Sequence, residues 1–108
     1  MGLDQWAYAV KGEEKKEIFF WCKHPNLESH MARLWHERGG EGHFNCQELE
    51  LSGDDILQLK ECHRNLSKMT GFFFGESRED DIEATDEFIG IAEDHLADGW
   101  KIIYTSWW

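Results

Sequence analysis

The chain of 108 residues lacks long apolar runs and CxxC pairs, and it has only 11 Lys and Arg against 22 Asp and Glu. No segment approaches the roughly 20 apolar residues that a membrane helix needs, so no contact with a membrane is expected. The start Met1–Trp6 has neither the basic and apolar stretches of a signal peptide nor the Ser or Thr at position 6 that myristoylation favours. No repeat, low-complexity tract or interdomain linker is present. We therefore expect a soluble intracellular protein that forms one domain over residues 1–108.

Catalytic and metal-binding motifs are also missing. The three cysteines, Cys22, Cys46 and Cys62, form no CxxC pair and are expected to be reduced. His30 and His36 fall on opposite sides of one expected helix, and no HExxH occurs among the six histidines. No EF-hand spacing, GxSxG elbow or phosphate-binding glycine loop is found. The sequence predicts no metal, no cofactor and no assignable catalytic residue, which favours a non-enzymatic protein.

Acidic side chains are abundant, and they are unevenly distributed. The formal net charge is −11, and residues 76–98 contain ten acids and one base, Arg78. One face should therefore carry most of the negative field, which argues against direct contact with nucleic acid because phosphate binding needs Lys and Arg. A basic protein partner, DNA mimicry and plain solubility all remain compatible with this charge.

Aromatic residues are plentiful, with six Trp and seven Phe. Three consecutive phenylalanines stand between glycines in the segment 70–75, Thr-Gly-Phe-Phe-Phe-Gly. Each buried Phe contributes roughly 1.5–3 kcal/mol, so this segment is predicted to be a short buried strand rather than a free loop. It would join the middle of the chain to the tryptophan-rich end, residues 100–108, and both are expected to lie in the interior.

Hydrophobic periodicity predicts an α+β fold. Alternating or continuous apolar residues indicate strands over 3–11, 17–23, 46–51 and 100–108, the last a central strand because both of its faces are apolar. Helices are expected from Pro25 to the glycines 39–40, from the N-cap candidate Ser52 to about residue 68, and from Thr85 or a preceding aspartate to about residue 98. The result is a two-layer single domain, with three helices on a mainly antiparallel sheet of about four to five strands.

One group of polar and aromatic residues lies at expected strand ends and loop starts. Aromatic walls with a few polar groups are typical of a small-ligand pocket, with Lys23 and His24 meeting an anionic group. The same residues suit an aromatic core in which Trp N–H groups need partners, and both interpretations stay open. The candidate ligand-binding residues are Trp21, Lys23, His24, Asn45, Gly71, Gly75, Ser106 and Trp107.

A second group is the acidic set of the third helix. Its carboxylates could dock on a basic surface of another protein, and they could occupy a groove that otherwise binds phosphates. The candidate partner-binding residues are Glu79, Asp80, Asp81, Glu83, Asp86, Glu87, Glu93 and Asp94.

Several segments together resemble a family of small proteins from tailed bacteriophages and prophages, a family with no established activity. The matching segments are residues 1–4, 21–24, 44–45, 70–75 and 104–108, with Cys22 where the family usually has Arg. Some members carry the name phosphoglycerate kinase, which we reject because that reaction needs two domains closing over ATP. The resemblance implies a phage protein in the cytoplasm of an infected bacterium.

The expected function is modulation of a host or defence protein through the acidic surface. The alternative is binding or sequestering of a nucleotide-like ligand, or a modest enzyme. The sequence does not indicate an oligomeric state.

Overall fold

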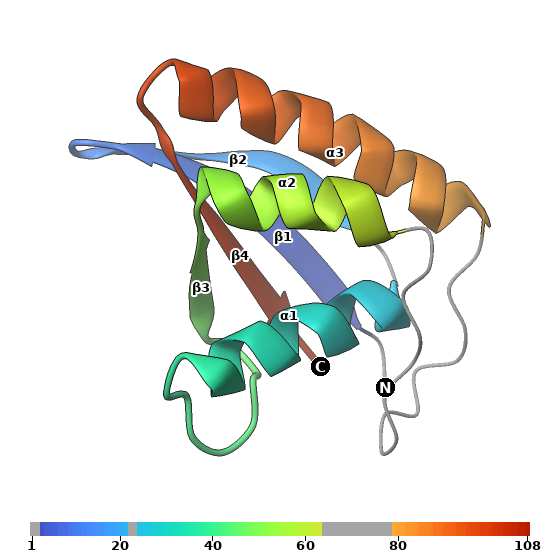
Figure 1. The fold of residues 1–108 in the computed structure, drawn as a ribbon. Coiled ribbons are helices and arrows are strands. Elements are labelled where there is room, and N and C mark those ends of the chain that lie inside the picture. Colours follow the sequence, from blue (N-terminus) through green and yellow to red (C-terminus); the bar gives the residue numbers. More distant parts are fainter. Residues whose placement is uncertain (1–2, 22–23, 64–78) are drawn as a thin grey trace.

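The structure, a computed structural model, describes residues 3–21, 24–63 and 79–108 (Figure 1). In chain order, its elements are β1 (Asp4–Lys11), β2 (Glu14–Trp21), α1 (Pro25–Glu37), β3 (Glu48–Leu51), α2 (Gly53–Cys62), α3 (Glu79–Ala97) and β4 (Lys101–Trp107). The strand expected over the phenylalanine triplet falls outside the described residues. No helix within the described ranges is long and apolar enough to cross a membrane.

The four described strands form one antiparallel sheet in the order β2-β1-β4-β3. β1 and β2 are a hairpin whose turn contains Gly12 at φ +61°, a conformation that glycine adopts without steric cost. β4 lies between β1 and β3, which confirms the prediction of a central C-terminal strand. With three helices beside the sheet, the predicted α+β class is confirmed.

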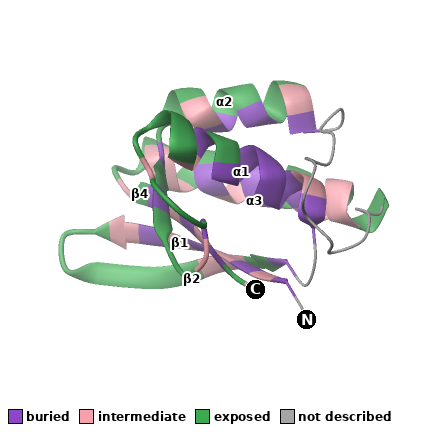
Figure 2. Cartoon of the chain, turned by 90° about the horizontal axis from the view of Figure 1, so that it is seen from below, coloured by how far each residue is buried: buried purple, intermediate pink, exposed green. Residues whose placement is uncertain are grey.

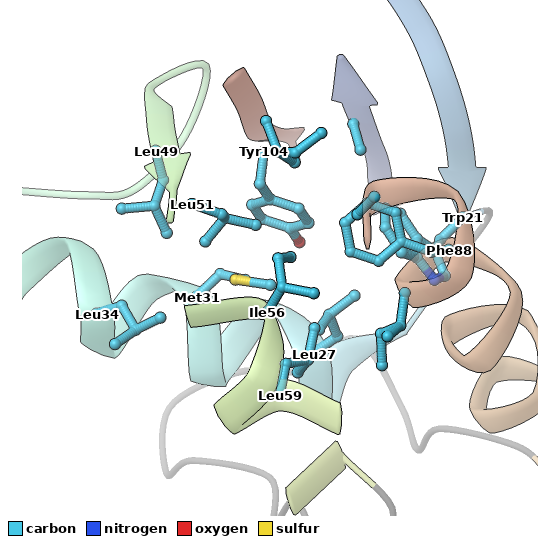
Figure 3. Close-up of a cluster of buried hydrophobic side chains, with 14 of the residues drawn as sticks. Trp21, Leu27, Met31, Leu34, Leu49, Leu51, Ile56, Leu59, Phe88 and Tyr104 are labelled. Atoms are coloured by element: carbon cyan, nitrogen blue, oxygen red, sulfur yellow. The ribbon is translucent and has the colours of Figure 1, made fainter. Parts of the chain in front are cut away.

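All three helices cover one face of the sheet, and the core lies between the two layers (Figure 2). Tyr104 of β4 stands near the middle of this core, between Leu51 and Met31 on one side and Phe88 and Trp21 on the other (Figure 3). The rings of Trp21 and Phe88 meet edge-on, with centroids 4.8 Å apart. Aromatic pairs in this geometry contribute beyond the area that they bury, so they hold α3 against the hairpin.

The helix ends follow the signals in the sequence, with two exceptions. The first is α2, which ends at Cys62, short of the expected end at about residue 68; residues 64–68 fall outside those that the structure describes. Ser52 caps α2 in a capping box, because its hydroxyl accepts from Asp55 N–H at 3.2 Å while the Asp55 carboxylate accepts from Ser52 N–H at 2.9 Å. Gly39 follows α1 at φ +94°, as expected for its cap. The second exception is α3, which begins at Glu79. Thr85 lies inside this helix rather than at its start, since the apolar stripe already continues through Ile82.

The side chains of β1 are distributed between the two faces of the sheet in an unusual way. The small Ala7 and Ala9 point into the core, whereas Trp6 and Tyr8 point to the uncovered face of the sheet. Strand alternation places Trp107 on that uncovered face too, and it is 58% exposed. The expectation that the whole tryptophan-rich end lies in the interior is therefore wrong for Trp107.

Candidate functional site

Glu28 is a fully buried carboxylate near the start of α1, with 0% of its surface exposed. Three donors from the end of the chain meet it. The hydroxyl of Tyr104 donates to Oε1 at 2.8 Å, while the hydroxyl of Ser106 and Nε1 of Trp108 donate to Oε2 at 2.9 and 3.1 Å. The carboxylate therefore ties α1 to the last residues of β4.

Gln5 extends this polar group from β1. Its Nε2 donates to Tyr104 Oη at 2.7 Å and to the carbonyl of His24 at 3.1 Å. Its Oε1 accepts from the backbone N–H of His24 at 2.7 Å. Both ends of the amide are thus used to hold the start of α1 beside the sheet. We call this group the Glu28 cluster; it consists of Gln5, His24, Glu28, Tyr104, Ser106 and Trp108.

The loop between α1 and β3 closes over the same end of the sheet. The side chain of Asn45 donates to the carbonyl of Trp108 at 2.8 Å and accepts from its N–H at 3.1 Å. Trp108 Nε1 also donates to the carbonyl of Phe44 at 3.0 Å, and the N–H of Cys46 donates to the carbonyl of Ser106 at 2.8 Å. These bonds satisfy polar groups at the edge of the core.

Burial dominates the electrostatics of the cluster. It raises the pKa of Glu28 to about 7, although the hydrogen bonds from Tyr104, Ser106 and Trp108 favour the ionised form. Burial also lowers the pKa of His24 to about 4, while the charge of Asp81 acts in the opposite direction. At neutral pH, His24 is therefore uncharged, and Glu28 holds its proton to a much higher pH than an exposed glutamate does.

The predicted ligand-binding residues fall into three groups. Trp21, His24, Asn45 and Ser106 are drawn into the interior or its rim, where Trp21 Nε1 donates to Thr85 Oγ1 at 3.2 Å. Trp107 lies on the opposite, uncovered face of the sheet. Lys23, Gly71 and Gly75 fall outside the described residues. The buried members have partners within the fold, which is the arrangement expected of an aromatic core, and their ligand-binding role stays a prediction.

Sequence reasoning missed the carboxylate at the centre of the cluster. A signal was present, because at 100° per residue Glu28 falls on the same side of α1 as Leu27 and Met31. An acid inside an apolar stripe costs free energy unless it is paired, so it points to buried hydrogen-bond donors. Its main partner, Tyr104, could not be found in this way, since 76 residues separate the two.

The acids of α3 form a contrasting surface. At about 100° per residue, seven of the eight predicted partner-binding acids fall within an arc of about 140° opposite the buried Phe88 and Ile89. All seven are exposed. Asp81 does not belong with them, because it is half-buried on the other side of the helix, where its charge acts on His24. We call the seven the acidic face; they are Glu79, Asp80, Glu83, Asp86, Glu87, Glu93 and Asp94.

Two residues of the acidic face have side-chain partners on α2 or just after it. Asp86 Oδ1 lies 2.7 Å from Nε2 of the buried His63, and Glu93 lies 3.4 Å from Lys60 Nζ. The remaining five acids form no ion pair with any described residue. Their negative charge is therefore available to a partner of the opposite sign; these five are Glu79, Asp80, Glu83, Glu87 and Asp94.

The described ranges contain no group of three or more His, Cys, Asp or Glu side chains that could hold a metal ion. Comparisons of the chain with known protein families, with curated proteins and with solved structures find no match.

Proposed function

We propose that this chain is a bacteriophage-encoded, non-enzymatic binding protein that acts in the cytoplasm of the infected bacterium. In this proposal, the acidic face of α3 docks on a basic surface of a host or defence protein and blocks or modulates it. The origin is inferred from the resemblance in the sequence, and the mode of action is inferred from the acidic face.

The observation that carries the proposal is the set of five carboxylates that form no ion pair with any residue that the structure describes. They lie along one side of a 19-residue helix, which is about 28 Å long. Exposed like charges along one face create a field that attracts and orients a basic partner. Solubility alone does not require that the acids gather on one helix, because scattered charges serve it equally well.

A nucleic-acid-binding protein is the kind of partner that suits this face. Its phosphate-binding groove is lined with Lys and Arg, and a row of carboxylates can occupy such a groove in place of phosphates. Binding of this kind excludes nucleic acid, so the protein would act as a DNA mimic. Nucleic acid itself is not expected to bind the acidic face.

The experiment compares two variants of equal charge in a pull-down from bacterial lysate. One variant changes Glu79, Glu83 and Glu87 to Gln and Asp94 to Asn. The matched control changes four exposed acids that lie outside α3, Glu13, Glu14, Glu41 and Glu61, to Gln. We expect the wild type and the control to retain a basic protein that the α3 variant loses. Retention should fall steeply between about 50 mM and about 500 mM salt.

Two further outcomes complete this test. Duplex DNA added to the lysate should displace the retained protein if the acidic face occupies a phosphate-binding groove. If both variants retain the same proteins as the wild type, the location of the charges has no role and the proposal fails.

Binding of a small ligand has less support, because Trp21, His24 and Ser106 are at most 2% exposed and have partners within the fold. A thermal-shift screen with nucleotides tests it directly. A ligand present at 100 times its Kd would add about 2.7 kcal/mol to the free energy of unfolding.

A further inference from the structure

We draw no further inference here: the strongest candidate, the open face of the sheet opposite the helices, on which Trp6, Phe20 and Trp107 lie, carries none, because nothing in the part of the chain that the structure describes shows what covers this face.

Discussion

The Glu28 cluster and the acidic face show what surroundings do to the same functional group. Glu28 is surrounded by three donors and has no contact with solvent, so its charge is costly and its hydrogen bonds are structural. Five carboxylates of α3 stand in water without an ion pair to a described residue. Their charge costs little, and their interactions are available to a partner. Carboxylates of the first kind hold the fold together, whereas those of the second kind are the ones on which the proposed function depends.

The largest effect is expected at the buried site. Glu28→Ala removes the acceptor of the Tyr104 and Ser106 hydroxyls, and an unsatisfied buried donor costs about 1–3 kcal/mol. We expect the free energy of unfolding to fall by about 3 kcal/mol at pH 5, measured by urea denaturation. The control is Glu83→Gln on the acidic face, which should change it by less than about 0.5 kcal/mol. Similar losses in the two variants would remove the distinction between the regions.

The pH dependence of stability sharpens the comparison. The pKa of Glu28 rises from 4.5 to about 7 on folding, so the folded state holds the proton more tightly. The proton on Glu28 therefore adds its whole contribution to the free energy of unfolding below about pH 4.5, and this contribution is lost as the pH rises to about 7. Glu28→Gln should remove this loss, and the stability of the variant relative to the wild type should rise by about 1.4 kcal/mol per pH unit in that window.

His24 acts in the opposite direction. Its pKa falls from 6.5 to about 4 on folding, so its contribution is lost as the pH falls from about 6.5 to about 4. The slopes of Glu28 and His24 oppose each other in the wild type between pH 4.5 and pH 6.5, and burial also lowers the pKa of His30. The Glu28→Gln variant should show the rising slope of the two histidines without the opposing slope of Glu28. A flat profile in this variant would contradict the assigned pKa of His24.

A smaller effect is expected at the start of α2. Ser52→Ala removes the side-chain half of the capping box, which should lower the free energy of unfolding by about 1 kcal/mol in urea denaturation. Ser52→Gly should cost only a few tenths of a kcal/mol, because glycine leaves the first turn accessible to water. An alanine variant as stable as the wild type would show that the cap is dispensable.

The smallest effect on stability is expected at the acidic face. Glu79, Glu83 and Glu87 repeat at four-residue intervals, and like charges at that spacing repel one another on a helix. The α3 variant with four neutralised acids should therefore be as stable as the wild type, or more stable by less than about 1 kcal/mol, with the gain shrinking in salt. A loss of several kcal/mol in thermal or urea unfolding would mean that the face is structural after all.

Much of the fold was predictable because local signals were strong. Apolar periodicity and the caps at Ser52 and Gly39 fixed the element types, and the apolar content of both faces of β4 fixed its central place. The candidate site was predictable only in part. Trp21, His24, Asn45 and Ser106 were chosen together, and all four contact the Glu28 cluster or belong to it, but Glu28 and Gln5 were missed. Nothing local to either residue reveals that a tyrosine 76 or 99 positions away would meet it.

The sequence by itself determined the class of the fold, the acidity of its third helix and the amphipathic division of that helix, because these depend on composition and on spacings within one element. Tertiary structure alone decided that Glu28 would be enclosed by donors from β4, and that Trp6, Phe20 and Trp107 would share an open face. Side chains from distant segments become neighbours only when strands pair and helices choose one side of the sheet. A pattern within one segment cannot contain that information.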